Sequence, residues 1–392
     1  MKNIILSNGK IVLPEKVVLC DLKIKDGKII EIGENLTKDK DCCVIDVSGK
    51  YVTPGFVDIH THGGYGSDFM DSNTSDFVNA LKFHTDNGTT TVVPTSCTAP
   101  KSEIIKFLDF VKQYLSNPNE SVATVYGVHL EGPYLSERNK GAQKKEDLAV
   151  PSSDDYSYML ENAGIIKTVT IAPELDGADE MTKQLTEKGI VVCGGHDDGV
   201  YPEFMPAIEN GLKHITHLFC VTSDVRFKNG VRNVGLREYA LIDDNLTAEL
   251  IADNKHIPVE LAKLIVRTKG VDKLCLVSDT LRCAGLKDDG TEYSLGSGQD
   301  AQKVVIKDGV AVVAGVGNYA GSITCVRKMI KNIMGAGVDL CSAVRMATIN
   351  PARIIGISDI TGSIEVGKLA DVCILDENLE IEKVFIKGKE VV

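Results

Sequence analysis

The pattern of apolar and polar positions divides the chain into two strand-rich ends and a long alternating middle. Four short β-type runs lie near the N-terminus, at 11–13, 17–19, 22–24 and 29–32. Asp26-Gly27 is a typical hairpin turn between the last two. Two more runs lie near the C-terminus, at 372–375 and 383–386, followed by a turn at 387–389. The simplest interpretation is that residues 1–52 and 362–392 meet in one small β-sandwich domain.

The middle of the chain alternates apolar, strand-like runs with helical patterns. Eight runs are strand candidates, at 56–61, 90–94, 124–130, 168–172, 190–194, 214–217, 247–251 and 274–278. Helical patterns separate most of them, for example at 77–87, 102–115, 180–188 and 202–210. Eight strand-then-helix units over roughly 250 residues are typical of a (β/α)8 barrel. The sequence therefore predicts an α/β fold in which a TIM barrel over 53–361 stands beside the small domain.

Residues that commonly bind metal ions stand at the ends of several predicted barrel strands. They are His60, His62, Glu131, His196, His217 and Asp279. Imidazole and carboxylate are the usual ligands of catalytic divalent metals. In (β/α)8 barrels the active site lies at the carboxyl ends of the strands. The pattern therefore favours a metal-dependent hydrolase.

Three of these residues, His60, His62 and Glu131, carry the argument for metal binding. His60 and His62 are two residues apart, so on a strand they share one face, with Asp58 one layer lower. The alternative is a His-Thr-His sequence at a loop entrance without function. Glu131 ends an apolar strand, where an unpaired carboxylate would be costly to bury. A bound cation removes that cost, and an ordinary salt bridge is the alternative.

The alternation of side chains along a strand helps to decide which of the other histidines point into the barrel. His214 and His217 are three residues apart, so on a strand they face opposite sides, and the strand-end position favours His217 as the inward residue. His129 is expected to be a hydrogen-bonded inner histidine. Asp279 suits a general base that takes a proton from water and returns it to a leaving amine. The alternative for Asp279 is a helix cap before Leu281.

Composition narrows the classes of partner. The formal net charge is −12 and the pI is near 5.2, which argues against nucleic acid or an anionic membrane as partner. A small phosphorylated substrate remains compatible. The 11 cysteines show no disulfide framework, and neither a signal-peptide pattern nor an apolar run of membrane-spanning length occurs. These features predict a cytoplasmic protein.

Motifs of other hydrolases and of nucleotide-binding proteins are missing from the sequence. There is no Gly-x-Ser-x-Gly, no P-loop and no His-Glu-x-x-His. The glycines at 315, 317 and 321 do not have dinucleotide-binding spacing, and a phosphate-binding role for them is a weaker hypothesis.

The order of motifs resembles the amidohydrolase superfamily and, within it, the N-acetylglucosamine-6-phosphate deacetylase family. The motifs cover nearly the whole chain: Pro54–Asp58 with His60–Gly63, His129–Pro133, Gly195-His196, Thr216–Phe219, Ile251–Asp253 with His256, Val277–Asp279, Ala320–Ser322 and Asn350–Ala352. The His-x-His pair is typical of the whole superfamily, whereas the Glu-Gly-Pro and Thr-His-Leu-Phe runs are specific to the family. The resemblance implies the same barrel and terminal β-sandwich.

The resemblance also implies roles for individual residues. It implies that Glu131, His196 and His217 hold one metal ion, and that His60 and His62 can hold a second one bridged by Glu131. One or two divalent ions per subunit, zinc or iron, are therefore expected. Asp279 matches the catalytic aspartate, near or on the metal.

Substrate contacts follow from the same resemblance. His256 matches the histidine that orients the substrate amide. Arg232 matches an arginine that reaches the phosphate of the substrate in the neighbouring subunit, which implies a homodimer. The phosphate-binding turn falls on Cys220 and Val221, and backbone groups of Ala320, Gly321 and Ser322 are further candidates.

The chain departs from the family pattern around the substrate. Cys220-Val221-Thr222 stand where the family has Asn-Ala-Met, and Asp197-Asp198 follow His196 in place of Ser or Thr and Asn. The predicted reaction is deacetylation of an N-acetylated amino sugar 6-phosphate, first of all N-acetylglucosamine 6-phosphate. The alternatives are another N-acyl amino sugar, such as N-acetylgalactosamine 6-phosphate, or a cyclic amide. A metal-bound but inactive binding protein is the alternative from another class.

Overall fold

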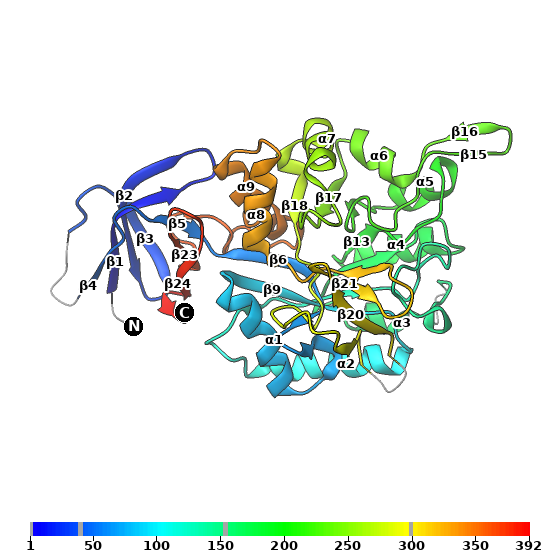
Figure 1. Ribbon diagram of the computed structural model, residues 1–392, viewed down its shortest axis with the longest axis horizontal. Coiled ribbons are helices and arrows are strands. Elements are labelled where there is room, and N and C mark those ends of the chain that lie inside the picture. The colour runs from blue at the N-terminus through cyan, green and yellow to red at the C-terminus, as the bar shows by residue number, and fades with distance from the viewer. Residues whose placement is uncertain (1–2, 38–41, 152–155, 298–300) are drawn as a thin grey trace.

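Two large sheets organise the chain in a computed structural model that describes residues 3–37, 42–151, 156–297 and 301–392. One sheet forms the barrel, and the other stands beside it and contains both ends of the chain (Figure 1). The first two residues of the predicted small domain, and residues 38–41, lie outside the described ranges.

The side sheet combines strands from both ends of the chain. Its strands are β1 (Asn3–Val12), β2 (Val17–Lys25), β3 (Lys28–Gly33), β4 (Cys42–Asp46), β5 (Tyr51–Pro54), β23 (Val372–Leu375), β24 (Ile381–Ile386) and β25 (Lys389–Glu390). β5 joins the two ends, because it pairs with β1 on one side and with β23 on the other. The predicted turn between β2 and β3 is present, with Asp26 and Gly27 at φ values of 49° and 78°. Apolar side chains from both ends, such as Leu22 and Phe385, share one core.

The barrel sheet is parallel throughout and nearly closed, which confirms the predicted fold. Its strands are β6 (Phe56–Thr61), β9 (Thr89–Ser96), β10 (Thr124–Val125), β11 (Val128–Glu131), β12 (Ile166–Ile171), β13 (Val191–Gly194), β14 (His214–Ile215), β17 (Thr247–Leu250) and β18 (Leu274–Leu276). The first barrel strand, β6, and the last, β18, are joined by a hydrogen bond just beyond the end of β18. There the N–H of Asp279 donates to the carbonyl of His60 at 2.9 Å. This bond brings the two ends of the barrel together at the site.

One predicted strand, 124–130, is broken in two at residues 126 and 127. Gly127 has a φ of 142°, and a Cβ at this position would lie 2.3 Å from the carbonyl oxygen of Ile165. The close approach of the next segment therefore separates β10 from β11, although both pair with β9.

Helices cover the outside of the barrel. They are α1 (Thr74–Asp86), α2 (Lys101–Ser116), α3 (Ser157–Glu161), α4 (Ala178–Glu187), α5 (Tyr201–Glu209), α6 (Leu236–Ile242), α7 (Val259–Lys269), α8 (Val326–Gly335), α9 (Leu340–Met346) and α10 (Ile349–Ile354). The helical patterns predicted at 77–87, 102–115, 180–188 and 202–210 correspond to α1, α2, α4 and α5. α2 shows the expected amphipathic face, since Ile104, Phe107 and Val111 are buried. Within the described residues no helix is long and apolar enough to cross a membrane.

Three insertions depart from the strand-then-helix pattern. A small antiparallel sheet between β18 and α8 consists of β19 (Glu292–Ser294), β20 (Lys303–Lys307), β21 (Val310–Val313) and β22 (Tyr319–Gly321). A hairpin of β15 (Arg226–Lys228) and β16 (Val231–Asn233) projects from the barrel at the upper right of Figure 1. The short strands β7 (Gly63–Gly64) and β8 (Ser67–Asp68) form a third, directly after β6.

Candidate active site

The structure brings all six strand-end residues together at one end of the barrel. His60 lies on β6 and His62 directly follows it, β11 ends on Glu131, and His196, His217 and Asp279 follow β13, β14 and β18. The last three have left-handed backbone conformations, with φ values of 49°, 24° and 45°. Such turns directly after a strand direct the side chains across the barrel mouth instead of along the sheet.

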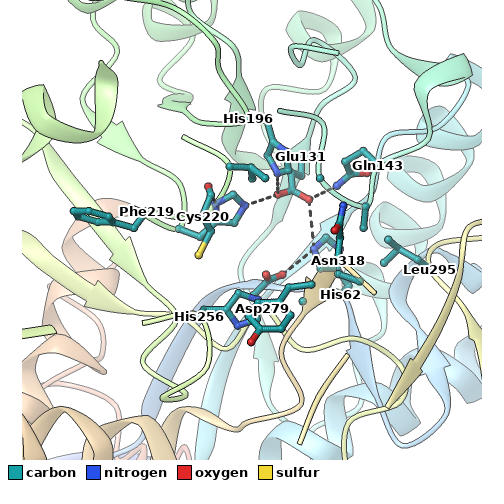
Figure 2. A pocket seen from close by; sticks show the side chains of 17 residues that line it. His62, Glu131, Gln143, His196, Phe219, Cys220, His256, Asp279, Leu295 and Asn318 are labelled. Atoms are coloured by element: carbon teal, nitrogen blue, oxygen red, sulfur yellow. Dashed lines mark hydrogen bonds and ion pairs between the residues drawn. The ribbon is translucent and has the colours of Figure 1, made fainter. Parts of the chain in front are cut away.

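Glu131 lies at the centre of the group (Figure 2). Its Oε1 is 3.0 Å from Nε2 of His196, 3.0 Å from Nε2 of His217 and 3.5 Å from Nε2 of His60. Its Oε2 is 3.5 Å from Nε2 of His62. Both carboxylate oxygens therefore face imidazole nitrogens that come from three different strands.

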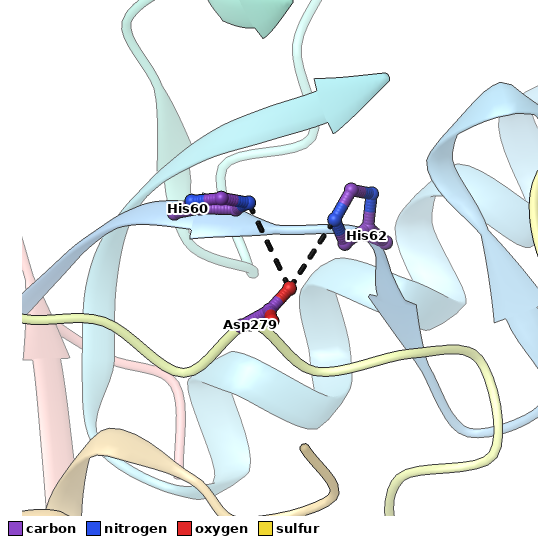
Figure 3. Close-up of side chains that lie close together, drawn as sticks. All are labelled: His60, His62 and Asp279. Atoms are coloured by element: carbon purple, nitrogen blue, oxygen red, sulfur yellow. Dashed lines mark ion pairs between the residues drawn. The ribbon is translucent and has the colours of Figure 1, made fainter. Parts of the chain in front are cut away.

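Asp279 approaches the same nitrogens from the opposite side. Its Oδ1 lies 3.3 Å from Nε2 of His62 and 3.7 Å from Nε2 of His60 (Figure 3). The side chain is not used as a helix cap, because Thr280 forms a β-bridge with Ser322 and the residues after Thr280 form a turn.

The donor set fits a divalent cation. The ligand atoms of His60, His62 and Asp279 lie within 4.8 Å of one another, as do those of His60, Glu131 and His217. All are buried, and Nε2 of His60 has no hydrogen-bond partner among the described residues. A buried polar atom without a partner is costly, and a cation facing these atoms would satisfy it. His196 belongs with the second group through its 3.0 Å contact with Glu131.

Hydrogen bonds behind the histidines fix the orientation of their rings. Nδ1 of His60 pairs with Oε2 of Glu249 at 2.9 Å, Nδ1 of His196 with the carbonyl of Asn139 at 2.9 Å, and Nδ1 of His217 with the carbonyl of Cys220 at 3.2 Å. A proton held on Nδ1 leaves Nε2 as the acceptor that a metal requires. Without a cation, burial alone would lower the pKa of His60, but the carboxylates of Glu249, Glu131 and Asp279 raise it to about 9, so a metal ion that binds Nε2 would have to displace a proton.

A cavity of about 340 Å³ opens beside this cluster. Of the predicted substrate residues, its lining includes Cys220, Val221, His256, Ala320 and Gly321. Figure 2 shows Phe219 and Cys220 on one side of the cluster and Leu295 on the other.

His256 enters the cavity on a fixed support. Its Nδ1 lies 2.8 Å from Oδ2 of Asp253, and its backbone N–H donates to Oδ1 of the same residue at 2.7 Å. Nε2 is therefore the ring nitrogen available to a substrate.

Two predicted substrate residues lie outside this lining. Ser322 is buried behind it and donates its backbone N–H to the carbonyl of Asp279 at 2.8 Å, so it supports the aspartate. Arg232 is exposed on β16 of the projecting hairpin.

The prediction that only one of His214 and His217 points into the barrel is wrong. β14 ends at Ile215, so the strand alternation no longer applies at His217. His217 reaches Glu131, and His214 is also buried inside, with Nε2 3.4 Å from Oε1 of Glu249. His129 is the hydrogen-bonded inner histidine that was expected, with Nε2 2.7 Å from Oγ1 of Thr170.

Three further residues of the site were not predicted. Gln143 donates from Nε2 to Oε2 of Glu131 at 2.6 Å, and its Oε1 accepts the N–H of Thr98 at 2.9 Å. Glu249 holds His60, and Tyr319 lines the cavity. Of the three, Glu249 left a sequence signal, since it is the one charged residue in the apolar strand candidate 247–251.

Comparison with known proteins agrees with this geometry. The model of the family described as "Amidohydrolase family" matches residues 51–391. The chain belongs to the amidohydrolase family. It is therefore a hydrolase that acts on an amide bond.

This chain is similar to two sugar-phosphate deacetylases over almost the full length of each. N-acetylglucosamine-6-phosphate deacetylase of Bacillus subtilis (strain 168) is 32% identical, over 93% of this chain and 91% of its own. N-acetylgalactosamine-6-phosphate deacetylase of Escherichia coli O157:H7 is 29% identical, over 94% and 93%.

Solved structures show the same architecture. N-acetylglucosamine-6-phosphate deacetylase of Pasteurella multocida matches with a TM-score of 0.90 and 26% identity, over 99% of both chains. A mutant of the Mycobacterium smegmatis enzyme, in complex with N-acetyl-D-glucosamine-6-phosphate, matches with a TM-score of 0.90 and 27% identity over 100% of both.

Proposed function

We propose that this chain removes the acetyl group of N-acetylglucosamine 6-phosphate and releases acetate and glucosamine 6-phosphate. The observation that carries the proposal is the position of Asp279, whose carboxylate faces the His60 and His62 nitrogens in the cavity that also contains His256. Similarity to deacetylases over nine-tenths of the chain supports the substrate. The galacto epimer is the second candidate, because one relative of similar identity carries that name.

The proposed cofactor is one or two divalent ions, zinc or iron, held by His60, His62, Glu131, His196 and His217 with Asp279. When bound, such an ion lowers the pKa of a water molecule to about 7 and polarises a carbonyl group. Dialysis against a chelator is expected to abolish acetate release, and added Zn²⁺ or Fe²⁺ to restore it. Full activity in a preparation with less than about 0.1 metal ion per chain would contradict the proposal.

The chain's own residues then move the protons. Asp279 accepts a proton from the attacking water and passes it to the amide nitrogen, so that the leaving group departs as a neutral amine. With both ring nitrogens protonated, His256 donates from Nδ1 to Asp253 and from Nε2 to the acetyl oxygen, on which negative charge develops. Asp253 keeps the ring of His256 in place for this contact.

A substrate phosphate bound in this cavity needs a positively charged side chain from outside the cavity lining to balance its charge. Among the described residues, the cavity lining contains neither lysine nor arginine. We therefore also propose a homodimer, in which Arg232 on the projecting hairpin reaches the substrate phosphate bound by the partner subunit. The proposed location of this dimer is the cytoplasm.

The test of the substrate is acetate release from a panel of N-acetyl amino sugars with and without the 6-phosphate. The expected order is N-acetylglucosamine 6-phosphate first, its galacto epimer next, and the unphosphorylated sugars far behind in kcat/KM. An unphosphorylated sugar that is as good a substrate, or a better unrelated N-acyl compound, would overturn the phosphosugar assignment while leaving the hydrolase intact.

A further inference from the structure

Tyr319 presents an aromatic ring at the rim of the catalytic cavity. It lines this cavity and also the neighbouring surface hollow that includes Lys255 and Lys307. The residue is 47% exposed, which is high for an aromatic side chain beside a catalytic centre. An aromatic ring that shares a cavity with the reacting groups and remains open to solvent can be covered by a ligand.

The backbone that carries Tyr319 is tied to the catalytic aspartate. Tyr319 begins β22, and three residues later Ser322 exchanges backbone hydrogen bonds with both neighbours of Thr280, donating to Asp279 at 2.8 Å and accepting from Leu281 at 3.2 Å. Gly321 permits this approach, because a Cβ there would lie 2.9 Å from the carbonyl oxygen of Asp279. The position of Tyr319 relative to the reacting groups is therefore fixed by short covalent and hydrogen-bonded links.

The preceding turn is equally well held. The N–H of Val313 donates to the carbonyl of Asn318 at 2.8 Å, and the N–H of Gly317 donates to the carbonyl of Val313 at 2.9 Å. These bonds close the loop between β21 and β22 just before Tyr319. A side chain on a closed turn loses little further backbone entropy when a ligand binds.

The ring of Tyr319 packs beside that of His256. The two ring centroids are 5.0 Å apart and the planes are inclined by 54°. His256 is itself held by Asp253. A molecule whose amide contacts His256 therefore has the ring of Tyr319 within reach of the atoms next to that amide.

The second large aromatic side chain in the lining is already engaged. Phe219 has the guanidinium carbon of Arg237 at 5.1 Å from its ring centroid. Tyr319 is thus the more available surface for an apolar ligand face.

We propose that Tyr319 is the platform on which the amino sugar ring of the substrate stacks, which makes it a specificity-determining residue. A pyranose ring has polar edges but C–H groups on its faces, and those faces bind well to an aromatic ring, which needs no hydrogen bond in return. The contact selects a cyclic sugar over a linear N-acyl compound. The inference rests on the proposed function, because it takes an N-acetyl amino sugar phosphate as the substrate.

Three variants test the platform by steady-state acetate release. Tyr319→Leu is expected to raise KM for N-acetylglucosamine 6-phosphate by about 2- to 13-fold, with a smaller change in kcat. Tyr319→Phe keeps the ring and is expected to remain close to wild type. Tyr201→Leu is the matched control, since Tyr201 is 45% exposed but lies on α5 outside the cavity lining. An unchanged KM in Tyr319→Leu, or an equal loss in Tyr319→Phe, would overturn the proposal.

A second measurement observes the contact directly. The chain contains no tryptophan, so Tyr319→Trp introduces a single fluorescent reporter. Titration with the product, glucosamine 6-phosphate, is expected to change its emission in a saturable way, at the concentrations that inhibit turnover. Unchanged emission at inhibitory concentrations would contradict stacking.

Different results would overturn the proposed deacetylase function and the stacking of the sugar on Tyr319. Wild-type protein that is fully loaded with metal but releases no acetate from any N-acetyl amino sugar phosphate would overturn the proposed function and this inference with it. Wild-type turnover combined with an unaffected Tyr319→Leu variant would overturn the stacking alone.

Discussion

Replacing Glu249 by glutamine is expected to weaken metal binding while the barrel stays folded. Glu249 is 1% exposed, and its Oε2 lies 2.9 Å from Nδ1 of His60 and accepts the N–H of His217 at 3.0 Å. Glutamine has nearly the same shape, so its amide oxygen can keep both contacts. The negative charge that holds the proton on Nδ1 of His60 is lost, and with it part of the preference of Nε2 to act as a metal ligand.

The size of the effect follows from this one hydrogen bond. A hydrogen bond to a charged group contributes about 1.5–3 kcal/mol, against about 0.5–1.5 kcal/mol for a neutral one. The difference of about 1–1.5 kcal/mol corresponds to roughly 5- to 15-fold in affinity. Partners behind a ligating histidine typically change metal affinity by about 10- to 100-fold. A loss of about tenfold is therefore expected for Glu249→Gln.

The assay is metal content at equilibrium. Stripped wild type and variant are dialysed against a series of buffered Zn²⁺ concentrations, and the bound metal is measured by elemental analysis. Asp371→Asn is the matched control, because Asp371 is also a buried carboxylate, with the N–H of Lys387 at 2.7 Å and the hydroxyl of Thr361 at 2.9 Å, but contacts no ligand. Thermal unfolding of the metal-free proteins checks that each variant folds. Identical zinc affinity in Glu249→Gln and wild type would refute the reasoning.

Three other changes have distinct expected outcomes. Asp279→Asn is expected to lower kcat by about 10²–10⁴ or more, because proton transfer is lost, with most of the metal retained on the histidines and Glu131; turnover above a tenth of wild type would assign proton transfer to another group. Arg232→Ala is expected to raise KM for a phosphorylated substrate more than it lowers kcat, and a fully active monomer in light scattering would argue against the shared site. Burial, followed by the charge of Asp197, raises the pKa of Glu174 from 4.5 to about 8, so the native state holds a proton that the unfolded state releases, and the contribution of Glu174 to stability falls as the pH rises through this range. Calorimetry should therefore show Glu174→Gln gaining in Tm relative to wild type between about pH 5 and about pH 9, and a constant difference would contradict this.

The sequence predicted the parts of the fold that depend on local periodicity. The candidate strand 56–61 has the same bounds as β6, because Phe56, Val57 and Ile59 form a short apolar run and all six residues of the strand are buried in the barrel. The rule that barrel sites lie at the carboxyl ends of strands then placed His60 and Asp279 near each other, 219 residues apart.

Strand reasoning failed where the backbone leaves the sheet. His217 has a φ of 24° and lies beyond β14, so its direction relative to His214 could not be derived from alternation along a strand. Gln143 and Tyr319 lie on a loop and on an inserted sheet, whose paths over the barrel mouth depend on contacts between distant segments. The contact of Gln143 with Glu131 and that of Tyr319 with His256 could therefore not be derived from the spacing of residues in the chain.

The left-handed turns at His196, His217 and Asp279 place catalysis and thermal stability in conflict. Residues other than glycine are strained in such turns, at a cost of about 1 kcal/mol or more, although aspartate, asparagine and histidine tolerate them better than most. Substitution of His196 or His217 by glycine would relieve that strain and remove a proposed metal ligand in the same step. If these residues are the ligands proposed above, glycine at His196 or His217 would make the barrel more stable and less active, so an intact barrel alone does not indicate an intact enzyme.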